Sequence, residues 1–312
     1  MSNDLAFLYD SSKCTACKGC QVACKVWNNL PSPLGLNSYE KTGSYQAPSN
    51  VNGETRLIMT FEELDNGLDW GVNWAFGRKS CQHCYNPACV STCPASALQV
   101  DSETGMVSVH EENCIGCQYC SGACPFDIPK YRGIGTTINK CTACLDRVKN
   151  GKQPTINDGD NTTQFQFNVP ACVHTCPPGA LKFGPRDEMI KIAQERVEHL
   201  KNREYLPCPD ASVYGVDEMD GLHVIHVLKY GAKAHGLPEN PSVNPLIDAL
   251  DILKPVSGIA TAGTVLGLGV AFAMGIGYKR DKLAYNTKTK ETYKIETGEV
   301  VKVGDGQEKD GK

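Results

Sequence analysis

The sequence of 312 residues has no marked excess of charge of either sign, because 31 Lys and Arg stand against 35 Asp and Glu. With a net charge of −4, the chain lacks the positive charge by which proteins hold the phosphates of nucleic acids. Hydrophobic residues make up 41% and charged residues 21%, which excludes a disordered chain. The length allows about two domains. We therefore expect a folded protein and no nucleic-acid partner.

The first ten residues contain no Lys or Arg and only a short apolar run. They lack the charged segment and the apolar core of a secretory signal peptide. The chain also lacks a Ser-His-Asp arrangement, a phosphate-binding glycine loop, paired acid–base carboxylates and a pterin site that stand above chance. We expect neither an export signal nor a catalytic site on this chain.

Cysteine is nearly absent from the second part of the chain and concentrated in the first. Residues 1–176 hold 16 of the 17 Cys, and only Cys208 follows. An odd count and repeated spacings of two residues argue against the disulfide framework of small secreted proteins. Thiolates that bind metal explain the clustering better, and Cys208 is expected to be a structural free thiol rather than an extra ligand.

The clustered cysteines form four groups with related spacing. The first and third read Cys-x2-Cys-x2-Cys-x3-Cys, the second widens its middle interval to four residues, and the fourth is split by 27 residues. The groups are Cys14, Cys17, Cys20 and Cys24; Cys81, Cys84, Cys89 and Cys93; Cys114, Cys117, Cys120 and Cys124; and Cys141, Cys144, Cys172 and Cys176. This spacing, with Pro after the last Cys of three groups, is that of bacterial iron–sulfur proteins. Because each of the four groups has a Cys at all four of its ligand positions, we expect four [4Fe–4S] clusters.

Zinc is an alternative, since two Cys-x2-Cys pairs can make a closed tetrahedral site. Zinc sites do not need the third Cys, the wider gap and the proline, which recur here. A metal-stapled structural scaffold without a redox function is a second alternative. In the iron–sulfur spacing, the fourth Cys binds the neighbouring cluster, so four groups predict two ferredoxin-like units with two clusters each.

Alternating apolar residues between the groups predict short strands, and the pattern repeats after Cys93-Pro94 and Cys176-Pro177. The expected strands are 5–9, 97–100, 106–109 and 179–184. Helical spacing predicts a helix over 187–205 and places His223 and His226 on a helical segment within 221–230. The polar segments 28–55 and 145–170 are expected to be surface loops, and the tail is expected to form a small hairpin around Thr297-Gly298.

Residues 255–278 contain no charged residue and lie between Lys254 and Lys279-Arg280. A helix of 24 residues is about 36 Å long and would cross a bilayer core of about 30 Å. Small residues recur every four positions and predict close packing on a partner helix; they are Gly263, Gly267, Ala271 and Gly275. We expect a single transmembrane helix, and a buried glycine-rich soluble segment is the alternative.

Basic residues are more frequent after this span than before it. Residues 279–294 contain six Lys or Arg, whereas residues 235–254 contain one. By the positive-inside rule, the tail lies in the cytoplasm and the cysteine-rich part on the outer face. A cytoplasm-facing assembly stays open, because long domains follow this rule poorly.

The chain resembles the four-cluster iron–sulfur subunits of molybdenum and tungsten bis-pterin oxidoreductases, and within them the formate dehydrogenase iron–sulfur (beta) subunits. The resemblance covers roughly residues 5–280 and rests on three segments: CTACKGCQVACKVWN (14–28), CQYCSGACPFDIP (117–129) and GLPENP (236–241). In that family the first group pairs with the fourth, and the second with the third.

The resemblance implies four ligand sets, which we label A to D. Set A is Cys14, Cys17, Cys20 and Cys176; set B is Cys141, Cys144, Cys172 and Cys24; set C is Cys81, Cys84, Cys89 and Cys124; set D is Cys114, Cys117, Cys120 and Cys93. The implied α+β fold has two interlocked ferredoxin-like units followed by one transmembrane helix. The segments are 1–55 with 140–185 (outer unit), 56–139 (inserted inner unit), 186–254 (helical or extended linker), 255–278 (transmembrane helix) and 279–312 (polar cytoplasmic tail).

The resemblance further implies an electron-transfer subunit for anaerobic respiration at a bacterial or archaeal cytoplasmic membrane. Its partners would be a large molybdenum or tungsten bis-pterin subunit that oxidises formate and a membrane cytochrome b that reduces quinone. In that family the catalytic subunit carries a twin-arginine signal, and the folded pair is exported together, which reconciles an outer location with the missing signal. Polysulfide, tetrathionate and hydrogenase complexes use similar subunits and stay open.

Four other residues lie in or beside the cysteine groups. His83 and His174 are placed to hydrogen-bond cluster sulfurs, although ordinary loop positions are the simpler interpretation. Trp27 and Tyr119 can either shield clusters from water or serve as core residues.

Overall fold

The computed structural model describes residues 4–31, 45–65, 71–133, 135–150, 155–158, 161–164, 168–243, 283–286, 288–289, 291–303 and 307–308. The chain divides into two compact units, Met1–Asp251 and Ile252–Lys312.

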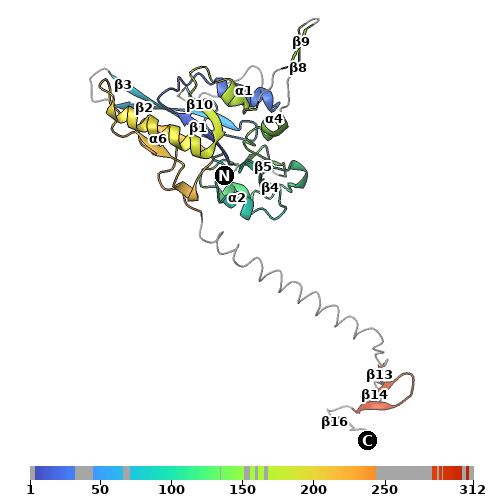
Figure 1. The fold of residues 1–312 in the computed structure, drawn as a ribbon. Coiled ribbons are helices and arrows are strands. Elements are labelled where there is room, and N and C mark those ends of the chain that lie inside the picture. The colour runs from blue at the N-terminus through green and yellow to red at the C-terminus, as the bar shows by residue number, and fades with distance from the viewer. Residues whose placement is uncertain are drawn as a thin grey trace. The chain divides into compact units, whose positions relative to one another are not determined.

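The first unit mixes short helices and strands (Figure 1). Its α-helices are α1 (Gly19–Trp27), α2 (Ala88–Ser91), α3 (Tyr119–Ala123), α4 (Leu145–Asn150), α5 (Ala171–His174) and α6 (Arg186–Asn202). Its strands are β1 (Leu5–Asp10), β2 (Leu57–Asp65), β3 (Val72–Ser80), β4 (Leu98–Val100), β5 (Val107–Val109), β6 (Lys130–Tyr131), β7 (Ile138–Asn139), β8 (Thr155–Asp158), β9 (Asn161–Gln164), β10 (Leu181–Pro185), β11 (Ser212–Tyr214) and β12 (Val224–Leu228). Its 3₁₀ helices are η1 (Glu111–Asn113), η2 (Glu218–Asp220) and η3 (Ala232–His235). The structure confirms the mixed helix and strand content expected from the sequence.

A four-stranded sheet in the order β10-β1-β12-β11 forms the frame of this unit. Strand β1 pairs antiparallel with β10 and parallel with β12, so that Phe7 lies between Phe183 and Val224. Strand β1 is therefore fixed on both edges by segments that lie more than 170 positions later in the sequence.

The alternation of side chains in β1 divides the unit into two layers. Ala6 and Leu8 pack against the face of α6 that carries Met189 and Ala193, and Figure 1 shows α6 lying across the sheet. Phe7 and Tyr9 point to the opposite face, where they pack with cysteines of the first and fourth groups. One face of the sheet is covered by a helix, and the other supports the cysteine-rich loops.

The remaining strands form two-stranded hairpins. Strands β2 and β3 pair over nine residues each, from Leu57 opposite Ser80 to Asp65 opposite Val72. The short pairs are β4 with β5, β6 with β7, and β8 with β9. Strands β1, β4, β5 and β10 and helix α6 confirm the elements predicted over 5–9, 97–100, 106–109, 179–184 and 187–205.

The helical prediction for residues 221–230 is wrong. Residues Val224–Leu228 form β12, a fully buried strand between β1 and β11. The β-branched residues Val224, Ile225 and Val227 suit a strand covered on both faces, and the helical spacing of the two histidines has no structural consequence. Strands β11 and β12 also show that the region 186–254 contributes to the main sheet.

The expected surface loop over 145–170 contains regular structure. It begins with helix α4 and continues with the β8–β9 hairpin, in which Asp158 lies opposite Asn161. Helix α4 follows directly from Cys144, so the split in the fourth cysteine group begins with a helix rather than with a loop.

The second unit contains a four-stranded antiparallel sheet in the order β13-β14-β15-β16. Its strands are β13 (Leu283–Asn286), β14 (Glu291–Lys294), β15 (Val300–Val303) and β16 (Gln307–Glu308). The β14–β15 turn contains Gly298 with φ +70°, which confirms the hairpin expected around Thr297-Gly298.

Within the described ranges, no helix has the length and apolar character needed to cross a bilayer. The predicted transmembrane helix over 255–278, with Gly263, Gly267, Ala271 and Gly275, lies outside the described residues.

Candidate metal centres

The first Cys-x2-Cys segment of every group adopts the same unusual backbone turn. The residue two positions after the first Cys has a positive φ in all four groups: Ala16 (51°), His83 (48°), Gly116 (70°) and Ala143 (54°). Non-glycine residues avoid this region, and such strain persists where the surroundings impose it, often at functional sites. The four cysteine groups therefore share a left-handed residue at the same position, although the residue type there differs.

The turn directs a backbone N–H toward the sulfur of the preceding cysteine. The N–H of Ala16 lies 3.3 Å from Cys14 Sγ, that of Ala143 lies 3.4 Å from Cys141 Sγ, and that of His83 lies 3.5 Å from Cys81 Sγ. Hydrogen bonds of this kind stabilise negative charge on sulfur and influence the reduction potential of an iron–sulfur centre. The strained turn thus prepares the first cysteine of each of these three groups to act as a thiolate ligand.

Set A lines one cavity of about 320 Å³. The cavity is bordered by Cys14, Cys17, Cys20 and Cys176. The first two belong to the loop between β1 and α1, Cys20 lies in the first turn of α1, and Cys176 follows α5. Contact between α1 and α5 brings these distant segments together.

Set B lines a second cavity, of about 300 Å³. It is bordered by Cys24, Cys141, Cys144 and Cys172, and also by the side chains of Arg56 and Arg78. Cys24 comes from α1, and Cys172 from α5. Because α1 supplies Cys20 to the first cavity and Cys24 to the second, this one helix connects the two cavities.

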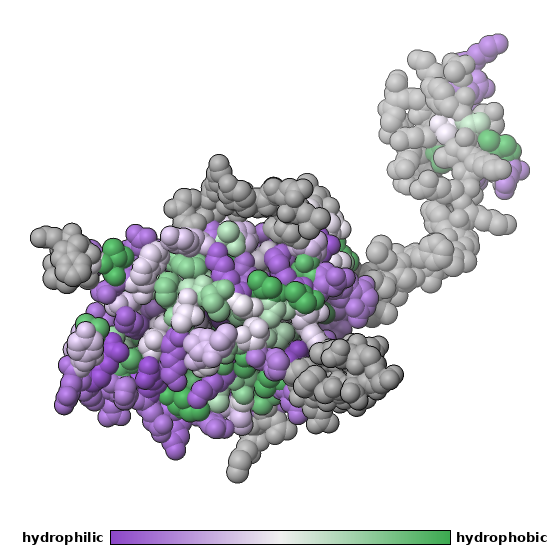
Figure 2. Space-filling view, turned by 90° about the horizontal axis from the view of Figure 1, so that it is seen from above, coloured by the Kyte–Doolittle hydropathy of each residue, from purple (hydrophilic) through white to green (hydrophobic). Residues whose placement is uncertain are grey.

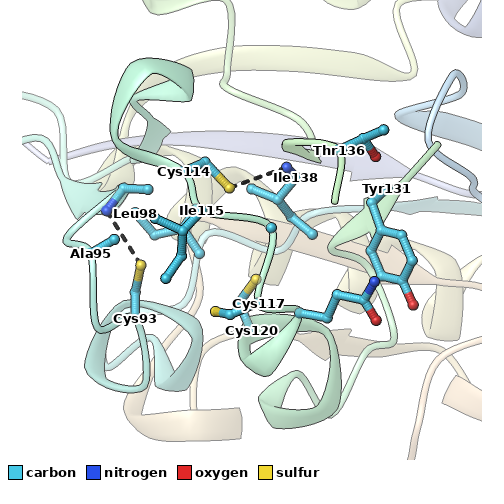
Figure 3. A pocket seen from close by; sticks show the side chains of 13 residues that line it. Cys93, Ala95, Leu98, Cys114, Ile115, Cys117, Cys120, Tyr131, Thr136 and Ile138 are labelled. Carbon is cyan, nitrogen blue, oxygen red and sulfur yellow. Dashed lines mark hydrogen bonds between the residues drawn. The ribbon is translucent and has the colours of Figure 1, made fainter. Parts of the chain in front are cut away.

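Set D lines a third cavity, of about 390 Å³, shown in Figure 3. Its border includes Cys93, Cys114, Cys117 and Cys120 together with the apolar side chains of Leu98 and Ile138. The N–H of Ala97 donates to Cys93 Sγ at 3.3 Å, and the N–H of Ile138 donates to Cys114 Sγ at 3.4 Å. Leu98 of β4 and Ile138 of β7 therefore provide apolar lining, and the two N–H donors are Ala97, directly before β4, and Ile138 itself.

The cysteines of set C lie near one another, as their electrostatic effects on each other show. Cys81, Cys124 and Cys89 all raise the pKa of the Cys84 thiol, after burial as the main cause. Cys81, Cys84 and Cys124 also belong to one hydrophobic cluster with Phe126. The second and third groups thus meet in the same part of the unit.

Burial raises the pKa of most of these thiols. The pKa is raised to about 12 for Cys20 and Cys144 and to about 11 for Cys120, with burial as the largest cause and neighbouring thiols acting in the same direction. Unliganded, these cysteines are neutral at physiological pH. A bound metal must supply the positive charge that removes their protons.

Two cations are buried among the cysteines. Lys140 is 1% exposed, and its ammonium donates to the carbonyls of Val107 (2.6 Å) and Cys141 (2.9 Å). Arg78 is also 1% exposed, and its guanidinium carbon lies 5.2 Å from the Phe7 ring centroid. Neither residue was identified from the sequence. The available signals were the position of Lys140 directly before Cys141 and that of Arg78 three positions before Cys81.

These features fit iron–sulfur clusters as the bound group. The donors are thiols gathered around cavities, with N–H groups aimed at sulfur and buried cations close by, which suits a group of net negative charge. Among the described residues, no three Cys, His, Asp or Glu side chains are arranged to hold a single metal ion.

The histidines and aromatic residues considered from the sequence have different environments. His83 is fully buried, and its Nδ1 accepts a hydrogen bond from the N–H of Val107 at 3.0 Å. His226 is buried and pairs with Gln82 Oε1 at 2.9 Å, while His174 lies at the end of α5. Tyr119 is 63% exposed, so it is not a core residue.

Cys208 lies away from the four sets. It is buried in the cluster of side chains between α6 and the main sheet, and the Arg203 guanidinium donates to its sulfur at 3.2 Å. This environment suits a structural thiol.

Apolar side chains reach the surface close to two of the cavities. Val22 and Val26 are exposed on α1, and Ile115 and Tyr119 are exposed in the loop and helix that carry set D. Figure 2 shows apolar residues (green) in small groups among hydrophilic residues (purple) on one face of the molecule.

Cysteine loops with a left-handed residue at the same position, packed with short hairpins around shared cavities, define an iron–sulfur protein of the ferredoxin type. Residues 72–186 match the family model of the 4Fe-4S dicluster domain. The chain is similar to the formate dehydrogenase-O iron–sulfur subunit of Escherichia coli (strain K12), with 34% identity over 281 residues that cover 89% of this chain and 85% of that protein. The chain belongs to the family of formate dehydrogenase iron–sulfur subunits, and it is an electron-transfer subunit rather than the catalytic one.

Two further relatives show the breadth of the similarity. The formate dehydrogenase iron–sulfur subunit of Haemophilus influenzae is 34% identical over 267 residues, covering 84% of this chain and 78% of that protein. A subunit of the anaerobic dimethyl sulfoxide reductase of Escherichia coli (strain K12) is 37% identical over 194 residues, covering 61% of this chain and 78% of that protein. The predicted resemblance to formate dehydrogenase iron–sulfur subunits is confirmed.

Proposed function

We propose that this chain holds four [4Fe–4S] clusters on sets A to D and conducts electrons from a formate-oxidising bis-pterin subunit to a membrane cytochrome b that reduces quinone. The observation that carries the proposal is the positive-φ turn that recurs two residues after Cys14, Cys81, Cys114 and Cys141. A left-handed residue at the same position of all four groups supports four related cluster-binding loops. The cavities lined by sets A, B and D support the pairing of the first group with the fourth and of the second with the third.

The proposed division of the chain follows from this pairing. Residues 1–55 with 140–185 make the outer ferredoxin-like unit, and 56–139 make the inserted inner unit. The region 186–254 joins them to a membrane helix over 255–278, which would pack on its partner through the ridge of Gly263, Gly267, Ala271 and Gly275. The tail over 279–312 is assigned to the cytoplasm and the clusters to the outer face of the membrane.

When bound, a fully Cys-ligated cluster supplies one-electron transfer and leaves no open iron for substrate. The chain has three tasks toward such a group. Its thiols bind iron, its backbone N–H groups stabilise charge on sulfur, and the apolar side chains of Leu98 and Ile138 exclude water from the cavity of set D.

The cluster count is tested by analysing the anaerobically purified holoprotein for iron and by EPR after reduction. The proposal requires about sixteen irons per chain and interacting [4Fe–4S] signals. A chain that binds zinc instead, or that shows no reducible signal, would contradict it and support the structural scaffold.

The substrate of the partner is tested by co-purification. The large subunit that copurifies with this chain should reduce a dye with formate as electron donor. A large subunit that is inert with formate but active with another substrate would remove the formate assignment and leave the electron-transfer function intact.

A second candidate is the same electron-transfer function in another bis-pterin reductase, such as a polysulfide or tetrathionate enzyme. The similarity to a dimethyl sulfoxide reductase subunit favours it. Electrons would then run from the membrane toward the catalytic subunit, so reduced quinol analogues would reduce the clusters of the purified complex, and formate would not.

The membrane assignment has a separate test. A chain that ends at residue 254 should leave the membrane fraction when it is expressed without its membrane partner, whereas the full chain should need detergent. Equal distribution of the two chains would rule out an anchor over 255–278.

A further inference from the structure

Arg78 is a buried cation without a conventional partner. It lies near the end of β3, opposite Met59 of β2, and is 1% exposed. None of its three guanidinium nitrogens has a hydrogen-bond partner of normal geometry. A buried guanidinium without hydrogen bonds or a counter-charge carries a large desolvation cost. Arg78 is buried despite this cost, at a position that lines the cavity of set B.

Arg78 lies among cysteines, the ring of Phe7 and the side chains of Tyr9, His83 and His226, on which its charge also acts. The guanidinium lies over Phe7 and lines the cavity of set B together with Cys141 and Cys172. Burial raises the pKa of Cys20 of set A, Cys172 of set B and Cys81 of set C, and the charge of Arg78 acts on all three thiols in the opposite direction. Arg78 therefore lines the cavity of set B, and its charge acts on cysteines of sets A and C as well.

Arg56 lines the same cavity and provides a contrast. Its guanidinium donates to Asn28 Oδ1 at 2.7 Å and to Asn139 Oδ1 at 2.5 Å, and it lies 3.9 Å from Glu111. Protein side chains alone therefore supply Arg56 with hydrogen-bond acceptors and a counter-charge. Arg78 differs because sulfur ligands are the only source of negative charge found around it in the described structure.

We propose that Arg78 is a positioning residue that raises the reduction potential of the cluster on set B and acts as the shared counter-charge between it and its neighbours. This inference rests on the proposed cluster function. A cluster with four thiolates carries a net charge of about −2 when oxidised and about −3 when reduced. Reduction adds one electron and neither forms nor breaks a bond. The fixed positive charge of Arg78 therefore stabilises the reduced state more than the oxidised state.

The test is a redox titration of the full-length holoprotein monitored by EPR, with Arg78→Gln and Arg78→Lys compared to wild type. Arg78→Gln should reduce the ratio of reduced to oxidised cluster on set B at least tenfold at a fixed potential. A tenfold change corresponds to a reduction potential lowered by about 59 mV for a one-electron step. The cluster on set D should keep its potential, because Arg78 does not line that cavity. Arg78→Lys retains the charge and should restore most of the shift. The signal that disappears in Cys24→Ser identifies set B.

Arg132→Gln is the matched control, because Arg132 is exposed and pairs with Glu54 at the surface. It should leave all potentials unchanged. The inference is overturned if Arg78→Gln has full iron content and unchanged potentials, or if Arg78→Lys shifts the potential as far as Arg78→Gln.

If Arg78→Gln loses clusters and Arg78→Lys keeps them, the result supports the requirement for a positive charge. If both variants lose clusters, the shape of the arginine side chain rather than its charge is needed, and the inference is overturned. Fewer than about sixteen irons in the wild-type chain would contradict the proposed function itself, so the two failures are distinguishable.

Discussion

The indole Nε1 of Trp27 donates a hydrogen bond to Asp146 Oδ2 at 3.2 Å and so joins helix α1 to helix α4. The Arg147 guanidinium carbon lies 4.6 Å from the same ring. Helix α1 carries Cys24, and α4 begins directly after Cys144, so the contact fixes two segments that line the cavity of set B. The aromatic residue thus connects the halves of one proposed metal site.

Trp27→Phe is therefore expected to lower the stability of the holoprotein. The substitution keeps an aromatic ring and removes the N–H, which costs about 1 kcal/mol, or about 2–4 °C in melting temperature for a unit of this size. Differential scanning fluorimetry under anaerobic conditions measures the shift. Asp146→Asn keeps an acceptor oxygen and should change the melting temperature less. A larger effect of Asp146→Asn than of Trp27→Phe would contradict the assignment of this hydrogen bond.

Cys24→Ser should damage the cluster on set B and spare the cluster on set A. The reason is that Cys24 borders the cavity of Cys141, Cys144 and Cys172, whereas the other three cysteines of the first group border the cavity of Cys176. EPR of the reduced variant should show the loss or conversion of one signal. Cys208→Ser is the matched control and should retain the full iron content. Loss of the set A signal instead would refute the exchange of fourth cysteines between groups.

Gly77→Ala should destabilise the first unit. A Cβ at this position of β3 would lie 2.0 Å from the carbonyl oxygen of His235 and 2.3 Å from Thr60 Oγ1, so β3 would have to move away from η3. Overpacking of this kind costs about 1–3 kcal/mol, measured by thermal unfolding. Gly122→Ala is the control, because a Cβ at Gly122 meets no atom within 4 Å. Similar melting temperatures for the two variants would show that β3 and η3 are not tightly packed.

The buried histidines should make the protein sensitive to acid. Burial lowers the pKa of His226 to about 3, with the charges of Arg78 and His235 acting in the same direction. The unfolded chain takes up this proton near a pH of about 6.5, so the stabilising contribution is complete above that pH and is lost as the pH falls toward the folded-state pKa of about 3.

In His226→Gln, the decrease of melting temperature between about pH 6.5 and about pH 5 should be less steep than in wild type. His199→Gln, at an exposed position of α6, is the control. Equal slopes for His226→Gln and wild type would mean that His226 is not held neutral in the folded state.

The alternation of apolar residues predicted the short strands between the cysteine groups, because it is a local pattern, and the cysteine spacing marked the four loops that carry a left-handed residue. The repeated turn was not predictable in the same way. Of the four positions with positive φ after the first Cys, only Gly116 carries the residue type that signals a left-handed conformation, whereas Ala16, His83 and Ala143 do not. At those positions the surrounding fold decides the backbone conformation.

Long-range packing explains the remaining differences. His223 and His226 have helical spacing, but pairing of β12 with β1 and β11 decides the structure of their segment. The burial of Arg78 and Lys140 also depends on contacts that no local pattern records. Basic residues in a polar sequence are ordinarily exposed, and only the assembled fold shows that these two are buried.

The central position of β1 has a consequence for synthesis of the chain. Strand β1 lies between β10 and β12, and its parallel partner Val224 follows Phe7 by 217 residues. At about 5–20 residues per second, the ribosome needs on the order of ten seconds or more to deliver that partner. Cys14, Cys17 and Cys20 emerge early but meet Cys176 only late in this interval. On the proposed assignment of set A, this site is complete only after more than half of the chain has been translated, so iron would enter it late.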